Sequence, residues 1–213
     1  MSENEYLARI KSDPQAAEAY LRRKPAKHRA EMHMLQTAFT ALGPPGGTVL
    51  DAPCGVGRAT IWLAEQGYRA TGIDLGEAAV ATAQREVRSA AVEATVERRD
   101  VFATGYAGRS FDKVLCFRLL HHFAQPELRE RLIAEATRVA DRHVLISYLS
   151  PCSYTTLRRR VRQWVTGKPL KQYPVSESEL REVFERHGFA PLLRVPRNRF
   201  LHSLQLAVFE RAR

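Results

Sequence analysis

The sequence predicts an α/β fold around a mostly parallel seven-stranded sheet that ends in an antiparallel strand. From residue 48 onward, short apolar runs alternate with longer helical patterns, and the last two apolar runs follow each other without a helix between them. The alternation indicates βαβ units, and the final pair indicates a closing hairpin. With 213 residues, the chain is long enough for one domain with a complete core.

The individual elements follow from the spacing of the apolar residues. An N-terminal segment, residues 1–44, is predicted to be helical over 14–42, and the Pro-Pro-Gly-Gly stretch at its end opens the main domain, residues 45–213. Helices are predicted around 60–64 and at 77–89, 126–139 and 176–187. Strands are predicted at 48–50, 68–73, 94–98, 113–117, 143–148, 189–195 and 203–209.

Composition limits the partners and the location. The formal net charge of +10 and the isoelectric point near 9.9 favour an anionic partner. The three cysteines are far apart and form no metal-ligand spacing, so we predict reduced thiols and no metal. No apolar run approaches the roughly 18 residues of a spanning helix, and the first residues do not resemble a signal peptide. We therefore expect a cytoplasmic protein, with the inner face of the membrane as a second location.

A glycine-rich turn follows the first predicted strand. The sequence VLDAPCGVGR, residues 49–58, runs from a strand pattern directly into a helical one. Gly55 and Gly57 permit a tight turn and a close approach of the backbone to a ligand, and the helix N-terminus offers free amide donors. By itself, such a turn is equally compatible with a purely structural role, in which the glycines only allow the chain to bend.

An acid at the end of the second predicted strand strengthens the case for a ligand. Asp74 lies 19 residues after Gly55, close to the offset of about 20 at which an acid holds ribose hydroxyls. The ends of these two strands lie side by side in such a sheet, so turn and acid face one crevice. A dinucleotide site would place a third glycine where Thr60 stands, which argues against a dinucleotide.

At this point the sequence resembles the class I S-adenosylmethionine-dependent methyltransferases, whose first motif reads Val-Leu-Asp-x-Gly-x-Gly-x-Gly. The similarity continues through GIDL at 72–75, RDVF at 99–102, FDKVL at 111–115 and LHHF at 120–123. The resemblance spans roughly residues 48–210 and implies a three-layer αβα sandwich, the cofactor S-adenosyl-L-methionine and methyltransferase activity. Pro53 departs from the family pattern, because a glycine is usual there and proline fixes φ and removes a donor.

The resemblance also implies a set of cofactor-binding residues. Asp51, Gly55 and Gly57 would surround the methionine part, Asp74 would hold the ribose, and Asp100 would hold the adenine amino group. Alternatively, Asp51 caps the turn, Asp100 is a solvated acid, and Phe117 is a core residue rather than a pocket residue. The predicted cofactor site comprises Asp51, Pro53, Gly55, Gly57, Arg58, Asp74, Leu75, Asp100, Val101, Phe102 and Phe117.

Methyl transfer from a sulfonium is an in-line displacement with a neutral leaving group, so alignment supplies most of the acceleration. A hydroxyl acceptor gains from a base, whereas an anionic acceptor needs none. Because ligands lie beyond the carboxyl ends of parallel strands, the catalytic candidates are Arg118, His121, His122 and Tyr148. Their structural alternatives are a cofactor-side role for His122, a helix cap for His121 and an amphipathic rim position for Tyr148.

Residues 151–172 form a basic insert within a stretch, 142–176, that contains no Asp or Glu. Leu157, Val161, Trp164 and Val165 share one helical face, and arginines occupy much of the remainder, at positions 158, 159, 160 and 162. In one interpretation the apolar face packs on the domain as a lid over the acceptor. In the other, the arginines bind phosphates of a membrane surface through residues 153–168, of RNA, or of a small metabolite.

The leading functional hypothesis is a methyltransferase for an anionic or phosphate-bearing acceptor, such as a membrane lipid or a lipid-linked glycan, with O-methylation favoured. RNA or small-metabolite methylation is the alternative within the same class. An aminopropyl-transferring enzyme of this fold would carry an acidic acceptor loop, which Arg118 does not suit. A non-catalytic module that binds the cofactor, a membrane or nucleic acid is the alternative of another class.

Overall fold

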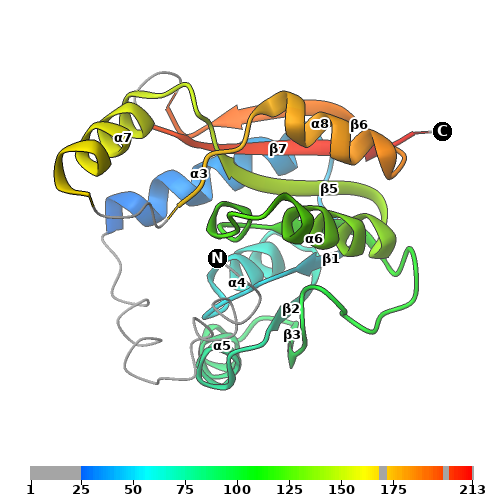
Figure 1. Ribbon diagram of the computed structural model, residues 1–213. Helices are drawn as coiled ribbons and strands as arrows, with labels where there is room; N and C mark the ends of the chain where they lie inside the picture. The colour runs from blue at the N-terminus through cyan, green and yellow to red at the C-terminus, as the bar shows by residue number, and fades with distance from the viewer. Residues whose placement is uncertain (1–24, 168–171, 199–201, 213) are drawn as a thin grey trace.

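The structure, a computed structural model, describes residues 25–167, 172–198 and 202–212. One seven-stranded sheet with the strand order β3-β2-β1-β4-β5-β7-β6 runs through the molecule (Figure 1). β7 lies between β5 and β6 and is antiparallel to both, whereas the other neighbouring strands pair in parallel. The strands are β1 Thr48–Asp51, β2 Arg69–Asp74, β3 Ala94–Arg98, β4 Phe111–Cys116, β5 Ala140–Leu149, β6 Phe189–Pro196 and β7 Leu204–Arg211.

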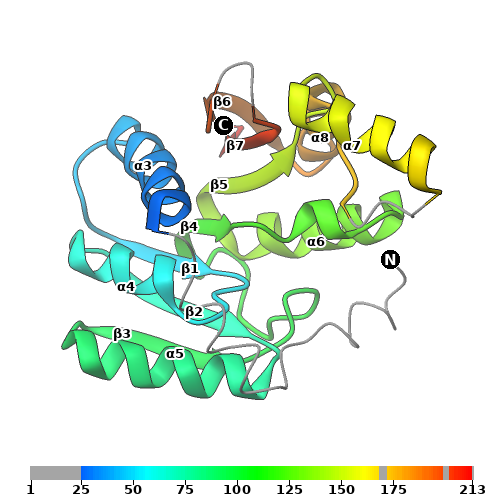
Figure 2. The ribbon, with the colours of Figure 1, turned by 90° about the vertical axis from the view of Figure 1, so that its left-hand side faces the viewer.

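Helices cover both faces of the sheet, which confirms the predicted three-layer α/β fold. On one face lie α3 Pro25–Ala41, α4 Arg58–Glu65 and α5 Glu77–Ala90, and on the other lie α6 Pro126–Val139 and α8 Glu177–Arg186 (Figure 2). α3 is the described part of the predicted helix at 14–42, and residues 14–24 lie outside the described residues. Its apolar side chains, Met34, Leu35, Ala38 and Phe39, are buried against the sheet.

The central strand β5 is buried on both faces from His143 to Leu149. Leu145 and Leu149 belong to the apolar cluster beneath α3 and α4, whereas Ile146 and Tyr148 belong to the cluster beneath α6 and α8. The sequence of a strand that is covered on both faces is a nearly continuous apolar run, without the alternation of apolar and polar residues. The sequence therefore predicts the strand but not the face to which each of its residues points.

The basic insert forms helix α7, Tyr154–Thr166, directly after the carboxyl end of β5. The Ser153 Oγ caps it by accepting a hydrogen bond from the Thr156 backbone N–H at 3.2 Å. A short 3₁₀ turn, η1 Leu120–His122, which the periodicity does not predict, follows β4. None of the helices in the described ranges is long and apolar enough to cross a membrane.

Candidate active site

The turn between β1 and α4 has two glycines in the left-handed region, with φ of 56° at Gly55 and 82° at Gly57. Only glycine adopts these angles without a steric cost. A Cβ on Gly57 would lie 3.1 Å from the Cβ of Ala83 on α5, whereas a Cβ on Gly55 would meet no atom of the described residues within 4 Å. Gly57 thus permits close helix packing, and open space lies beside Gly55.

The turn is held by backbone hydrogen bonds on both sides of Pro53. The Ala52 N–H donates to the Leu115 carbonyl at 2.9 Å, and the Cys54 N–H donates to the Ile73 carbonyl at 2.8 Å. The peptide between Ala52 and Pro53 is cis. Backbone bonds to β4 on one side and β2 on the other therefore hold the turn without a donor from proline.

Asp74 joins the glycine turn to the end of β2. Its Oδ2 accepts a hydrogen bond from the Gly55 N–H at 3.0 Å, and its Oδ1 accepts one from the Gly76 N–H at 2.8 Å. The residue is only half-buried. A carboxylate fixed in this way between two turns, with open space beside Gly55, is placed to accept hydrogen bonds from the hydroxyls of a ligand.

Asp51 is buried at the end of β1, and its Oδ2 accepts a hydrogen bond from the Thr60 hydroxyl at 2.7 Å. Burial raises the pKa of Asp51 to about 7, the Thr60 hydrogen bond opposes this shift, and the charge of Asp74 adds to it. A Cβ on Gly72 would lie 2.7 Å from the Thr60 Oγ1. Gly72 therefore makes room for the hydroxyl that holds Asp51.

The end of β3 lies next to Asp74, because the Arg99 N–H donates to the Asp74 carbonyl at 3.1 Å. Asp100 accepts a hydrogen bond from the Phe102 N–H at 2.9 Å, and Val101 is buried. The half-buried Phe102 ring packs edge-to-face on Phe123, with centroids 5.4 Å apart. The carboxyl ends of β2 and β3 thus place these predicted residues along one edge of the sheet.

Two further predicted cofactor residues have structural contacts of their own. The half-buried Leu75 accepts a hydrogen bond through its carbonyl from the Arg98 Nε at 3.1 Å. Phe117, at the end of β4, is half-buried and packs against the apolar cluster beneath α3 and α4. Both stay predictions as cofactor residues.

A buried ion pair connects α3 to the residues around the glycine turn, and the sequence analysis does not predict this pair. The Arg118 Nη1 donates to the Oε1 of the fully buried Glu31 at 2.8 Å, and the Arg58 Nη2 lies 3.8 Å from the Glu31 Oε2. Arg58 also lies 3.2 Å from His28 Nδ1. The sequence does indicate that Glu31 is buried, because Glu31 shares a helical face with Met34, Leu35 and Ala38, but it does not indicate which residues pair with Glu31.

His121 and His122 form the end of η1. His121 is fully buried, and burial lowers its pKa to about 2, with the charges of His122, Arg118 and Arg159 adding to the effect. Its ring nitrogens accept or donate no hydrogen bond within the described part of the chain. The half-buried His122 ring lies 4.5 Å from the His121 ring. Burial and nearby positive charge thus favour the neutral form of the His121 imidazole.

Tyr148, near the carboxyl end of β5, is buried inside the protein. Its side chain is 1% exposed and packs in the apolar cluster beneath α6 and α8, where burial raises its pKa. The alternative interpretation of Tyr148 as an amphipathic rim residue is therefore corrected, and its role as a catalytic residue stays a prediction. Its neighbour Ser147 is at the site, and the Ser147 Oγ accepts a hydrogen bond from the Arg118 N–H at 2.5 Å.

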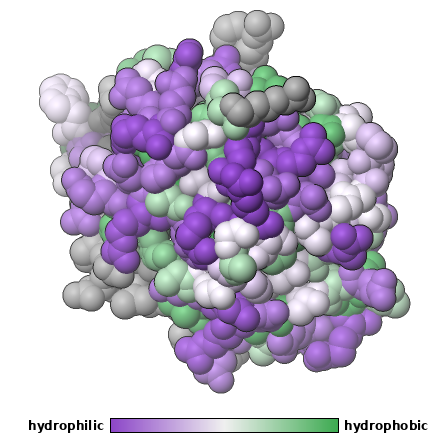
Figure 3. Space-filling model, turned by 90° about the vertical axis from the view of Figure 1, so that its right-hand side faces the viewer, coloured by the Kyte–Doolittle hydropathy of each residue, from purple (hydrophilic) through white to green (hydrophobic). Residues whose placement is uncertain are grey.

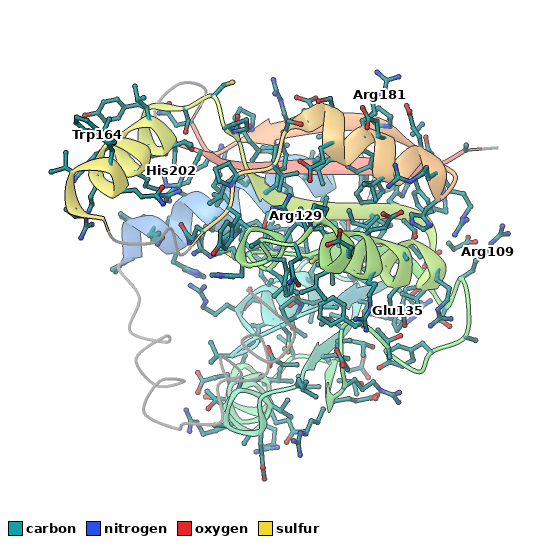
Figure 4. All side chains as sticks on the ribbon, viewed as in Figure 1. Arg109, Arg129, Glu135, Trp164, Arg181 and His202 are labelled. Carbon is teal, nitrogen blue, oxygen red and sulfur yellow. The ribbon has the colours of Figure 1, made fainter. Side chains whose placement is uncertain are left out.

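Positive charge gathers between the base of α7 and the site. The half-buried Arg159 donates to the Ser203 Oγ at 3.3 Å, and burial together with the charge of Arg118 lowers its pKa. His202, which Figure 4 shows near α7, has a pKa lowered to about 4 by burial and then by Arg197, Arg159, Lys27 and Arg118. Arg118, which follows β4, and Arg159 on α7 thus both lower the pKa of His121 and of His202.

Comparison with known proteins agrees with this geometry. A family described as a methyltransferase domain matches residues 49–142. The magnesium-protoporphyrin O-methyltransferase of Synechocystis is 28% identical over 68% of this chain and 64% of that protein. A ubiquinone biosynthesis O-methyltransferase of Pseudomonas fluorescens is 38% identical over 40% of this chain and 37% of that protein. The chain therefore covers less than two thirds of the length of these relatives.

Two solved structures share the fold. The magnesium protoporphyrin IX methyltransferase of Synechocystis with bound SAH has a TM-score of 0.73 and 21% identity, covering 86% of this chain and 82% of its own. The 1,6-didemethyltoxoflavin-N1-methyltransferase of Burkholderia thailandensis has a TM-score of 0.72 and 22% identity, covering 100% of this chain and 92% of its own. At these identities, the likeness shows the fold alone.

Proposed function

We propose that the chain is a class I S-adenosylmethionine-dependent methyltransferase that methylates an anionic acceptor, because residues 49–142 match a methyltransferase domain and the fold is the one expected for this family. The observation that supports the cofactor site is the carboxyl of Asp74, which the Gly55 and Gly76 amides hold beside a space that no described residue fills at Gly55. S-adenosyl-L-methionine, when bound, supplies an electrophilic methyl group on a sulfonium. The residues around the turn fit this cofactor.

Each group at the turn has a proposed task. Asp74 accepts hydrogen bonds from the ribose hydroxyls, and its half-buried position leaves it within reach of a ligand. Asp51 provides a negative charge for the methionine part when it is ionised, and Thr60 keeps its carboxyl oriented. Gly55 and Gly57 let the backbone approach the ligand. Asp100 remains the candidate for the adenine amino group.

The charge at the site supports an anionic acceptor whose methylated atom is an oxygen. Arg159 provides positive charge at the carboxyl edge of the sheet beside Arg118, which is paired with Glu31, and the two relatives described above carry O-methyltransferase names. An oxygen that is already anionic needs no base. His121 is too weak a base for a hydroxyl because its pKa is about 2, so His122 is the candidate base for such an acceptor. A membrane lipid or lipid-linked glycan is the favoured acceptor class, ahead of RNA and small metabolites.

Replacing Asp74 with Ala tests the cofactor site. We expect the wild-type chain to bind S-adenosyl-L-methionine with a micromolar Kd in titration calorimetry, and Asp74→Ala to weaken binding at least tenfold, about 1.4 kcal/mol. Asp74→Asn removes the charge but keeps one oxygen that can accept a hydrogen bond from the turn. Comparing it with Asp74→Ala therefore separates the effect of the lost charge from the effect of a distorted turn. Glu182→Ala, at an exposed acid on α8, is the control and should bind normally. A wild-type chain that does not bind the cofactor contradicts the proposal.

The acceptor class can be identified by following the methyl group that the protein transfers. Purified protein and methyl-labelled cofactor are incubated with fractionated cell extract, and the label is followed into lipid or glycan, RNA, protein and small metabolites. Label in an anionic lipid or glycan is the expected result. Cofactor binding without transfer to any fraction would favour a non-catalytic cofactor-binding module.

A further inference from the structure

Helix α7 shows its apolar side to solvent and its polar side to the protein. Its five large apolar side chains are between 52% and 87% exposed, and Trp164 is the most exposed of them. At about 100° per residue, these positions fall within an arc of about 100° on the helix. The set comprises Tyr154, Leu157, Val161, Trp164 and Val165. An ordinary surface helix of a globular protein has the opposite arrangement.

Polar contacts fix this orientation. The Thr156 hydroxyl donates to the Ser150 carbonyl at 2.8 Å, and the Ser203 N–H donates to the Thr155 Oγ1 at 2.9 Å. Arg159 reaches the Ser203 Oγ from the same side of the helix. Thr156 is 1% exposed, so this polar side is the one that faces the protein, next to the end of β5 and the start of β7. The apolar side therefore faces away from the domain, as Figure 4 shows for Trp164.

Positive charge borders the exposed apolar strip. Arg158 and Arg162 are both exposed, and their helical positions lie about 20° and 60° beyond that of Val165. No acid occurs anywhere between residues 142 and 176. Apolar side chains with an exposed tryptophan, bordered by arginines, form the pattern of a helix that lies in the interface of an anionic bilayer.

We propose that α7 docks the protein on the surface of an anionic lipid bilayer. Nucleic acid would engage the arginines but would leave the apolar side chains in water. A bilayer accounts for both features, because the apolar strip inserts at the boundary of headgroups and acyl chains while the arginines meet the lipid phosphates. The exposed apolar surface also needs an occupant, since isolated domains rarely display such a strip.

The position of α7 decides which edge of the protein meets the bilayer. The helix follows the carboxyl end of β5, on the edge of the sheet that carries Asp51, Asp74 and Arg118. The opposite end of the molecule, seen in Figure 3, is mainly hydrophilic and shows apolar residues only in small patches. Docking by α7 would present the candidate active site to the membrane. Delivery of a lipid-borne acceptor rests on the proposed function, whereas the docking itself does not.

Vesicle sedimentation of the full chain tests the proposal at low salt. The wild-type chain is expected to sediment with phosphatidylcholine vesicles that contain about 30% phosphatidylglycerol, and much less with pure phosphatidylcholine. The triple variant Leu157→Gln, Trp164→Gln, Val165→Gln should lower the vesicle-bound ratio at least about tenfold. The double variant Arg158→Gln, Arg162→Gln should lower it about tenfold on anionic vesicles.

Matched controls lie on other surfaces. Leu192→Gln removes an exposed apolar side chain from β6, and the double variant Arg88→Gln, Arg181→Gln removes two exposed arginines from α5 and α8. Both should sediment like the wild-type chain. All α7 variants should bind S-adenosyl-L-methionine normally, which shows that they are folded and separates failure of docking from failure of the proposed function.

Trp164 reports insertion directly. In a Trp62→Phe background, Trp164 is the only tryptophan of the chain, and its emission should shift to the blue on anionic vesicles and be quenched by brominated acyl chains. Absence of sedimentation at low salt overturns the proposal, as does an unchanged Trp164 emission or an equal loss in the control variants. Retention by RNA without vesicle binding would overturn it in favour of a nucleic-acid partner.

Discussion

Asp51→Asn is expected to raise the melting temperature at pH 8 by at least about 3 °C. Burial raises the pKa of Asp51 from its ordinary value of 3.8 to about 7, so the folded protein holds this proton more tightly than the unfolded chain does. Stability therefore falls as pH rises from about 4 through 7, where Asp51 ionises inside the protein. Asparagine carries no charge and still accepts the Thr60 hydrogen bond. Differential scanning calorimetry measures the change.

The same substitution, Asp51→Asn, is expected to weaken binding of the cofactor. In the proposed site, the ionised carboxyl of Asp51 attracts the positively charged methionine part of the cofactor. The affinity of the wild-type chain for S-adenosyl-L-methionine should therefore rise as the pH passes through about 7 and then level off. Asp51→Asn should bind about thirtyfold more weakly at pH 8, about 2 kcal/mol, and should lose this pH dependence. Ionisation of the ligand affects both proteins equally, so the variant is its own control. A wild-type affinity that is flat between pH 6 and 8 would contradict the assignment.

The opposite expectations for stability and binding distinguish a ligand-binding acid from a structural one. A carboxyl that only capped the turn would stabilise the fold, and its replacement by asparagine would leave cofactor affinity unchanged. For Asp51 we expect the opposite, because the residue is buried and its raised pKa means that the ionised form destabilises the folded protein. Such a group is typical of a functional site, where strain is offset when the ligand binds.

The sequence predicted the glycine turn and its acid because local rules determine both. A strand that passes into a helix through glycines needs left-handed angles, and Gly55 and Gly57 have them. Parallel neighbours place the end of β2 beside that turn, so the hydrogen bond from Gly55 to Asp74 follows from spacing alone. Chain order, helix positions and the closing hairpin were predictable for the same reason, with boundaries that differ by a few residues.

Features that depend on distant partners were not predictable. The burial of Tyr148 was not predictable because β5 is covered on both faces, so no alternation shows which way its ring points. The helical pattern of α7 shows which residues share a face, but the contacts that turn its apolar side outward come from Ser150 and Ser203. Amphipathicity indicates a helix and its two sides, and tertiary contacts decide which side is buried.

Glu31 is the clearest case of a partner that local pattern cannot reveal, because its arginines follow β1 and β4. Its carboxyl is fully buried, and the side chains of Arg58 and Arg118 are 18% and 19% exposed. The pair connects α3 to the start of α4 and the end of β4, next to the glycine turn. Removing one partner of a buried pair is costly, since the remaining charges stay behind without compensation.

Glu31→Gln is therefore expected to lower the free energy of unfolding by about 3 kcal/mol in urea denaturation. The control is Glu177→Gln, which removes the same charge from an ion pair with Arg194 whose side chains are 58% and 52% exposed. Solvent screens that pair, so its loss should cost less than about 1 kcal/mol. The difference between the two variants should persist at high salt, because salt screens exposed charges far more than buried ones. Equal destabilisation in both variants would show that Glu31 does not fasten α3 over the site.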